Sequence, residues 1–126
     1  MRKITLAFAL AAVVMSVISG TAFAEGNPAA GAKVFNKCKA CHTIKEGGKH
    51  KVGPNLHNIV GRAAGVAEGY RYSKAMAKSG ITWDEATLIA YLEKPRKYLK
   101  GTKMSFAGLK KLADRENVIT YLKAPQ

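Results

Sequence analysis

Two cysteines and a histidine lie within five residues of one another, and their types and spacing are the clearest indication of chemistry in the chain. They form the segment Cys38-Lys39-Ala40-Cys41-His42, and the 126 residues contain no other cysteine. The C-x-x-C-H pattern is typical of covalent haem attachment, in which two thiols add to the haem vinyl groups and the adjacent histidine reaches the iron. The segment therefore predicts one covalently bound haem c, attached through Cys38 and Cys41, with His42 as an axial ligand.

Two other kinds of site also use a C-x-x-C pair, namely a zinc site and a thiol-disulfide active site. A zinc site needs further ligands, and His50 and His57 lie in a glycine-rich stretch without a convincing ligand spacing. A dithiol oxidoreductase of the thioredoxin kind needs alternating strands and helices, whereas no period-two apolar pattern is sustained along this chain. Haem attachment is therefore the favoured interpretation.

The N-terminal segment has the pattern of an export signal. Arg2 and Lys3 precede an apolar run over residues 4–18, and Ala22-Phe23-Ala24 then supplies a small-x-small cleavage site. The run is short for a bilayer span, so we expect a cleaved signal peptide over residues 1–24 and no retained membrane anchor. One mature domain over residues 25–126 would then work in the periplasm.

The chain is strongly basic, and this limits its partners. It has 21 lysines and arginines against 8 aspartates and glutamates, which gives a formal net charge of +13. A charge of this size favours association with acidic surfaces. Export away from cytoplasmic nucleic acid argues against a nucleic-acid partner, so we expect a monomer that meets acidic proteins.

The rest of the sequence predicts an all-α fold of four or five helices, with glycine-rich loops wrapped around the haem. Helix caps and breakers predict a first helix that starts at Pro28, is capped by Asn27 and runs into the attachment motif, followed by a loop over residues 43–69. A short helix capped by Ser73 should end at Gly80, and a longer one should begin at Thr82 with a capping box and end near Pro95.

The remaining residues are expected to form one further turn over residues 96–100, a loop over residues 101–108 and a last helix over residues 109–123. The packed side of this last helix would carry Leu112, Val118, Ile119 and Leu122.

The first and last helices are expected to pack together. Gly31 would let their backbones approach closely, near Phe35, Val118 and Tyr121.

The identity of the sixth iron ligand is less clear, because the spacing of residues alone leaves several candidates. The mature chain offers Met76, Met104, His50, His57 and several lysines. Met104 stands out because its loop has glycine at both ends and can present a thioether inward. A methionine in a helical protein is nevertheless often a core residue rather than a ligand.

Six segments, read together, closely resemble mitochondrial cytochrome c and the bacterial cytochromes c2, and so the class I c-type cytochromes. They cover nearly the whole mature chain and are Lys37-Cys38-Lys39-Ala40-Cys41-His42-Thr43, Gly53-Pro54-Asn55-Leu56-His57, Gly80-Ile81-Thr82-Trp83, Tyr91-Leu92-Glu93-Lys94-Pro95, Lys100-Gly101-Thr102-Lys103-Met104 and Phe106-Ala107-Gly108.

The resemblance implies a role for each residue that matches the family pattern. His42 and Met104 would be the axial ligands, and the Pro54 carbonyl would accept a hydrogen bond from His42 and orient its imidazole. Further matches are Arg62, Tyr72 and Trp83 at the haem propionates, Tyr91 packed near the methionine ligand, Thr102 hydrogen-bonded beside it, and Phe106 over the haem edge.

The resemblance also implies a function and a docking face. The function would be one-electron shuttling, without enzyme activity, from a bc1-type donor complex to a photosynthetic reaction centre or a terminal oxidase. Seven basic residues match the family's ring around the exposed haem edge, and we call them the docking ring: Lys33, Lys37, Lys51, Arg96, Lys103, Lys110 and Lys111. The sequence leaves photosynthetic and respiratory roles equally open.

Two residues depart from the family pattern. Met76 stands where the mitochondrial proteins usually carry a buried asparagine, which places a second thioether near the haem. Lys100 stands where many relatives carry proline, so the methionine loop has lost one φ restraint. We therefore expect this loop to open more readily.

Overall fold

The computed structural model describes residues 24–124, and the predicted signal peptide lies outside them except for Ala24. The helices, in chain order, are α1 (Pro28–Phe35), α2 (Lys74–Ala77), α3 (Glu85–Glu93), α4 (Pro95–Tyr98) and α5 (Leu112–Lys123). Within this part of the chain, β-pairing is limited to one isolated antiparallel bridge between Ala63 and Thr82. The predicted all-α fold is confirmed.

No helix between residues 24 and 124 combines the length and the apolar character that a membrane crossing requires.

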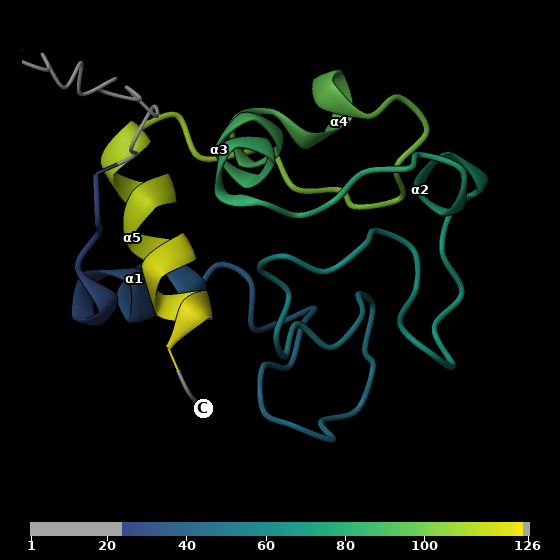
Figure 1. Ribbon diagram of the computed structural model, residues 1–126, viewed down its shortest axis with the longest axis horizontal. Helices are drawn as coiled ribbons and strands as arrows, with labels where there is room; N and C mark the ends of the chain where they lie inside the picture. The colour runs from purple at the N-terminus through teal and green to yellow at the C-terminus, as the bar shows by residue number, and fades with distance from the viewer. Residues whose placement is uncertain (1–23, 125–126) are drawn as a thin grey trace, which may run out of the picture.

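Helices α1 and α5 cross in close contact at the left of Figure 1. A Cβ atom on Gly31 would lie 2.0 Å from the Asn117 carbonyl oxygen and 2.7 Å from the Tyr121 Cβ. The rings of Phe35 and Tyr121 lie 5.4 Å apart between centroids, and Val118 is only 2% exposed. The predicted close approach at Gly31 is therefore confirmed, and only a residue without a side chain fits there.

The start of α1 is tied to α5 by its backbone as well. The Gly26 N–H donates to Thr120 Oγ1 at 2.9 Å, and the Asn27 N–H donates to Asn117 Oδ1 at 2.8 Å. The Asn27 side chain also accepts from the Ala30 N–H at 3.0 Å, as expected for an N-cap. These bonds fix the segment before α1 against α5.

Helix α3 begins later than the capping box at Thr82 predicted. Its N-cap is Asp84, whose carboxylate accepts from the Thr87 N–H at 2.8 Å, and this bond lowers the pKa of Asp84. Thr82 is engaged in the isolated bridge, and the Trp83 N–H donates to the Arg62 carbonyl at 2.9 Å. Because this pairing holds residues 82 and 83 in an extended form, helical geometry starts only after them.

The last helix also begins later than predicted, at Leu112 rather than at Leu109. The Leu109 N–H donates to the Leu92 carbonyl at 2.7 Å, which holds this residue beside the end of α3. A Cβ atom on Gly108, whose φ is +108°, would lie 1.9 Å from the Glu93 carbonyl oxygen. Leu112 is 48% exposed, so its predicted place on the packed side of the helix is wrong.

The two shortest helices lie close to their predicted positions. Ser73 caps α2 by accepting from the Met76 N–H at 3.1 Å, but α2 ends at Ala77 instead of Gly80. The further turn predicted over residues 96–100 is α4, which starts with Pro95 and ends at Tyr98. Proline suits the first helical position because its missing N–H has no partner there.

Arg115 is a buried charge that the sequence pattern did not reveal. It lies on α5, is 7% exposed, and donates to the Ile89 carbonyl of α3 at 2.8 Å. Its guanidinium also pairs with the Glu93 carboxylate at 3.5 Å. The buried arginine therefore joins α5 to the end of α3, while its Nε is buried without a hydrogen-bond partner.

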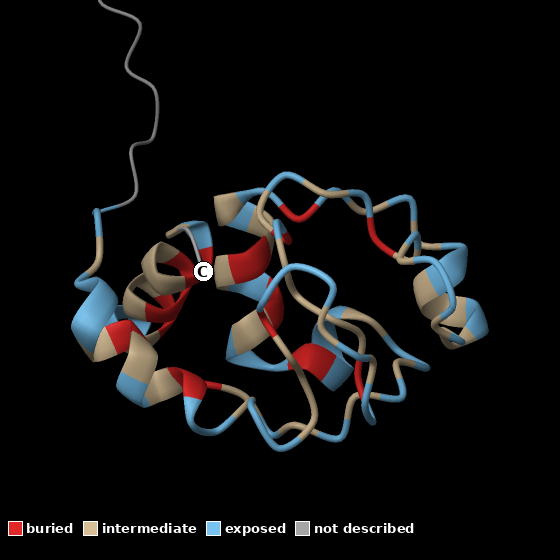
Figure 2. Ribbon diagram, turned by 90° about the horizontal axis from the view of Figure 1, so that it is seen from below, coloured by how far each residue is buried: buried red, intermediate tan, exposed pale blue. Residues whose placement is uncertain are grey.

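Figure 2 shows that the buried positions concentrate where α1, α3 and α5 meet, while the long loops contribute mainly partly buried and exposed ones. The best-buried side chains in this region include Val118, Ile119 and Leu88, at 2%, 3% and 5% exposure. This packed half of the molecule is the scaffold against which the loops are placed.

The crossing at Gly31 leads to a stability prediction. Gly31→Val should lower the free energy of unfolding by about 3 kcal/mol or more, because the new side chain meets the α5 backbone and no rotamer avoids it. Ala29→Val adds the same residue at an exposed position of α1 and should cost less than about 1 kcal/mol. Denaturant unfolding of both variants measures the difference, and equal losses would contradict the proposed crossing constraint.

Candidate haem-binding site

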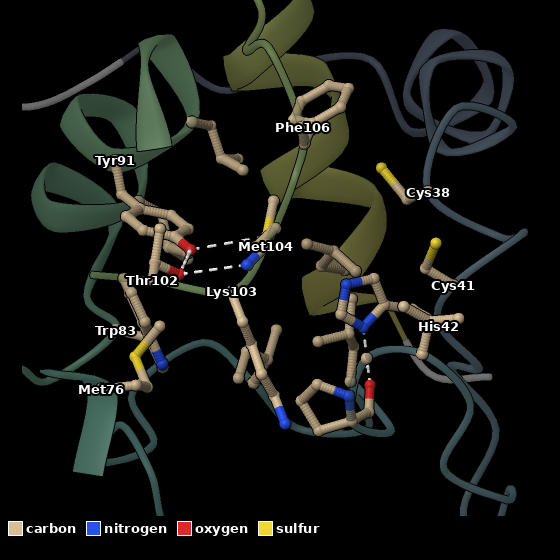
Figure 3. A pocket seen from close by; sticks show the side chains of 18 of the residues that line it. Cys38, Cys41, His42, Met76, Trp83, Tyr91, Thr102, Lys103, Met104 and Phe106 are labelled. Atoms are coloured by element: carbon tan, nitrogen blue, oxygen red, sulfur yellow. Dashed lines mark hydrogen bonds between the residues drawn. The ribbon is translucent and has the colours of Figure 1, made fainter. Parts of the chain in front are cut away.

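A cavity of about 350 Å³ lies between the packed helices and the loops. Every residue that the sequence predicted at the haem lines it: Cys38, Cys41, His42, Pro54, Arg62, Tyr72, Trp83, Tyr91, Thr102, Met104 and Phe106. Met76 lines it as well, and Figure 3 shows it beside Trp83. The fold thus brings together residues that are far apart in the sequence.

The attachment motif follows α1 as further turns of chain. The Cys38 N–H donates to the Phe35 carbonyl at 2.8 Å, and the His42 N–H donates to the Cys38 carbonyl at 3.0 Å. A bond from one residue to the fourth before it is a helical turn, so Cys38, Cys41 and His42 lie on one side of the chain. Figure 3 shows both sulfur atoms and the imidazole along the same wall of the cavity.

Both cysteine side chains are partly buried. Burial and the neighbouring Cys41 raise the pKa of the Cys38 thiol, more than the charge of Lys37 lowers it. The Cys38 side chain lies against the cavity wall.

His42 is oriented by one hydrogen bond. Its Nδ1 lies 2.7 Å from the Pro54 carbonyl oxygen, and since a carbonyl only accepts, Nδ1 carries the proton. Burial lowers the pKa of His42, more than this hydrogen bond raises it, so the ring is neutral near pH 7. The lone pair is consequently on Nε2, which Figure 3 shows on the cavity side of the ring.

Gly53 makes room for this ring. A Cβ atom at Gly53 would lie 2.3 Å from Cε1 of His42. The Gly53 N–H donates to the Cys41 carbonyl at 2.8 Å, which holds the Gly53–Pro54 segment against the attachment motif. The Gly53-Pro54 pair therefore supplies both the space for the imidazole and its hydrogen-bond acceptor.

Met104 extends from the wall opposite the attachment motif (Figure 3) and is held by polar contacts. The Tyr91 hydroxyl donates to the Met104 sulfur at 3.4 Å, and the Met104 N–H donates to Thr102 Oγ1 at 3.4 Å. Tyr91 is buried at 4% exposure against Trp83, with ring centroids 4.7 Å apart. Burial raises the pKa of Tyr91, so its hydroxyl stays protonated and able to donate.

The residues predicted at the haem propionates also have partners within the chain. Arg62 donates to the carbonyls of His57 at 3.0 Å and Asn55 at 3.1 Å. The Tyr72 hydroxyl accepts from the Ala67 N–H at 3.1 Å. These contacts fix a guanidinium and a phenol at the cavity wall, where they can serve carboxylate groups.

All members of the docking ring are exposed, but only Lys37 and Lys103 line the cavity. Two of them have ammonium groups held by other parts of the chain. Lys51 donates to the Lys39 carbonyl at 2.7 Å, and Lys103 donates to the Arg71 carbonyl. The side chains of Lys51 and Lys103 are therefore more restrained than an exposed lysine that makes no such bond.

The donors and the cavity fit a covalently bound haem. Native interiors hold few voids larger than a water molecule, so a cavity of this volume in the middle of the fold matches a large internal group. Two thiols on one wall match the attachment positions, and a neutral imidazole nitrogen and a thioether sulfur on opposite walls match axial ligands. The site residues are accordingly suited to haem c.

Sequence reasoning missed two residues at the rim of the cavity, Val52 and Tyr70. Both line the cavity, and Val52 is 75% exposed. The Tyr70 hydroxyl donates to the Val52 carbonyl at 2.6 Å. Both lie in loops, where no helical or strand period marks which side chains turn inward, so the sequence carried no signal for them.

Known proteins provide an independent comparison. The family model for cytochrome c matches residues 28–125. Cytochrome c-554 of Methylosinus trichosporium is 47% identical over 122 residues, which cover 97% of this chain and 92% of that protein. Cytochrome c2 of Rhodoblastus acidophilus is 54% identical over 97 residues, which cover 77% of this chain and 91% of that protein.

A solved structure agrees with these sequences. Cytochrome cH from Methylobacterium extorquens superimposes with a TM-score of 0.74 at 46% identity, covering 78% of this chain and 98% of that one. Sequence, fold and the composition of the cavity lead to the same conclusion. The chain belongs to the cytochrome c family and is a class I c-type cytochrome.

Proposed function

We propose that this protein is a monomeric periplasmic electron carrier that holds one haem c through Cys38 and Cys41, with His42 and Met104 as the axial ligands. The observation that carries the proposal is the placement of the His42 imidazole and the Met104 thioether on opposite walls of one cavity. A haem c bound there supplies a one-electron iron couple. The protein's part is to attach it, fix both ligands and limit access of water.

The identity of the two ligands favours transfer of electrons over catalysis. Together, His42 and Met104 would supply both of the protein's iron ligands, so no ligand position would be left for a substrate. A thioether favours the ferrous state and so raises the reduction potential. The hydrogen bond from Tyr91 to the Met104 sulfur withdraws electron density from that sulfur and keeps it in one orientation.

The charge of the protein supports acidic partners. With the docking ring around the haem edge, the protein would approach acidic faces of membrane redox complexes, a bc1-type complex as donor and a reaction centre or terminal oxidase as acceptor. Charges of one sign near a docking face speed association and fix orientation more than they raise affinity. The signal peptide over residues 1–24 would deliver the chain to the compartment where such complexes are accessible.

An absorption spectrum of the purified protein tests this function against two other classes. The carrier should be low-spin, with a weak band from sulfur-to-iron charge transfer in the ferric form. High-spin ferric iron would indicate a peroxidase-like enzyme with an open sixth position. A protein with no haem absorption would be a dithiol protein.

The first prediction for this site concerns the sixth ligand. Met104→Ala should leave haem attached through Cys38 and Cys41, abolish the sulfur-to-iron band, and lower the reduction potential by on the order of 0.1 V or more. Met76→Ala is the matched control, because it removes the other thioether in the cavity and should leave the band in place. Survival of the band in Met104→Ala together with its loss in Met76→Ala would assign the ligand to Met76.

The second prediction concerns the docking ring. Lys37→Glu, Lys51→Glu or Lys111→Glu should each slow association with an acidic partner by about threefold to tenfold at low salt, with little change in spectrum or potential. The difference should shrink as ionic strength rises past about 0.1 M, where the Debye length is about 10 Å.

Lys123→Glu provides the control for position, since this lysine is not a member of the docking ring and pairs instead with Glu85 at the start of α3. It should slow association much less than the other three changes. Stopped-flow kinetics would measure all four, and equal slowing would show that net charge, rather than a defined face, guides the encounter.

A further inference from the structure

A second, smaller cavity lies where the chain enters the domain. It has a volume of about 260 Å³, and Ala24 and Glu25 line it together with residues of α3 and α5. None of these residues lines the haem-binding cavity. The proposed electron-carrier function leaves this second cavity unused.

This entry cavity is acidic although the chain is basic. Glu25, Glu85 and Glu116 line it, and they are three of the eight acidic residues in the whole sequence. Among the described residues of its lining, Lys123 is the only basic one, and it pairs with Glu85. Within residues 24–124, neither Glu25 nor Glu116 forms an ion pair. The lining therefore has carboxylates in excess of cations.

Backbone contacts fix the chain at the edge of this cavity. The Gly26 N–H donates to Thr120 Oγ1 at 2.9 Å, and the Asn27 N–H donates to Asn117 Oδ1 at 2.8 Å. A Cβ atom on Gly26 would lie 2.5 Å from the Glu116 carbonyl oxygen, so the chain lies directly against the backbone of α5. Glu25 is the next residue, about 3.8 Å away between Cα atoms. Its backbone nitrogen is therefore held close to the residue that carries the Glu116 carboxylate.

The predicted signal-peptide cleavage would place a new charge at this nitrogen. The cleavage motif ends at Ala24, so hydrolysis breaks the peptide bond between Ala24 and Glu25. The water consumed leaves a carboxylate on Ala24, which departs with the signal peptide, and an α-amine on Glu25. Such an amine is mostly protonated near pH 7. Cleavage thus replaces a neutral amide by a cation at the wall of an acidic cavity.

Lys123 shows that the carboxylates of the entry cavity act on a cation placed beside them. The hydrogen bond to Glu85 and its charge, with a smaller contribution from Glu25, raise the pKa of Lys123. An ammonium on Glu25 would meet the same set of carboxylates. Glu85 is already engaged by Lys123, whereas Glu116 forms no ion pair within the described part of the chain. Glu116 is therefore the carboxylate available to the new cation.

We propose that the α-ammonium left on Glu25 by signal-peptide cleavage forms an ion pair with Glu116, and that this pair clamps the segment before α1 onto α5 in the mature protein. The proposal rests on cleavage after Ala24, which accompanies the proposed periplasmic function. In the precursor the Glu25 nitrogen is an uncharged amide, so the pair is absent there. Maturation thus adds a contact at the crossing of α1 and α5.

The first test measures how fast the α-amine of the mature holoprotein reacts with an acetylating reagent near pH 7. Only a neutral amine reacts, so a paired ammonium reacts slowly. Glu116→Gln keeps the shape of the side chain but removes its charge, and it should speed acetylation of Glu25 by about twofold to fourfold at low salt, as expected for an exposed ion pair. Mass spectrometry of the N-terminal peptide measures the rate.

Asp114→Asn is the matched control, because it removes one negative charge from the same helix at a residue that does not line the entry cavity. It should change the acetylation rate by less than about 1.5-fold. Equal acceleration by Glu116→Gln and Asp114→Asn would show that only the general charge of the protein acts on the amine, and would overturn the pair.

A one-residue extension tests whether the position of the ammonium matters. Inserting one alanine between Ala24 and Glu25, with cleavage still after Ala24, moves the ammonium about 3.8 Å along the chain. In this background Glu116→Gln should alter the rate by less than about 1.5-fold. The same acceleration in both backgrounds would contradict a defined ion pair.

Hydrogen exchange of the Asn27 amide tests the clamp, since this amide is bonded to Asn117 of α5. It should exchange about twofold to fourfold faster in Glu116→Gln than in the unmodified mature protein, and Asp114→Asn should leave it unchanged. Unchanged exchange in Glu116→Gln would overturn the clamp even where acetylation is faster.

N-terminal sequencing of the purified protein tests the cleavage separately. A chain that begins at Glu25 with a free amine is expected. A chain that begins elsewhere, or whose N-terminus is blocked, would overturn the ion pair. Either result would leave the absorption spectrum as an independent test of the electron-carrier function.

Discussion

Apolar side chains from α1, α3, α5 and the loops converge on one cavity, and this convergence is the constraint on which the rest of the structure depends. Val118 and Leu122 from α5, Leu88 from α3 and Phe35 from α1 all line it, although they also form the core. A chain of this size buries a limited amount of surface, and much of its core also serves as the cavity wall. Ile44, Ala64 and Ile119 belong to the core without lining the cavity.

Because the core and the cavity share residues, the helices and the loops contribute to the site in different ways. The crossing of α1 and α5 at Gly31 is backbone against backbone, so its geometry does not depend on anything in the cavity. The loop that contains Pro54 is placed by individual hydrogen bonds, such as the one from His42 to the Pro54 carbonyl. The helices thus set the size of the site, and the loops set its chemistry.

The same division separates what the sequence could predict from what it could not. Caps and breakers at Asn27, Ser73 and Pro95 act through nearest neighbours, so the helices that they start were predicted close to their observed bounds. Thr82 and Leu109 satisfy local helix rules too, but the antiparallel bridge between Thr82 and Ala63 and the backbone hydrogen bond from Leu109 to Leu92 exclude them from helices. Local sequence patterns do not show which distant residues will form these backbone contacts.

For the site, the cysteine pair was visible because its residue type and spacing are unusual, whereas Met104 was singled out from several candidates by the resemblance to a known family. The residues at the rim were not visible, because a tyrosine such as Tyr70 is ordinary in a loop and its place at the cavity depends only on what the fold puts beside it. Lys103 illustrates the point most sharply, since its position in the docking ring predicted an outward charge, yet its ammonium is bound to Arg71 and Tyr70. A side chain engaged within the molecule presents less mobile charge to a partner.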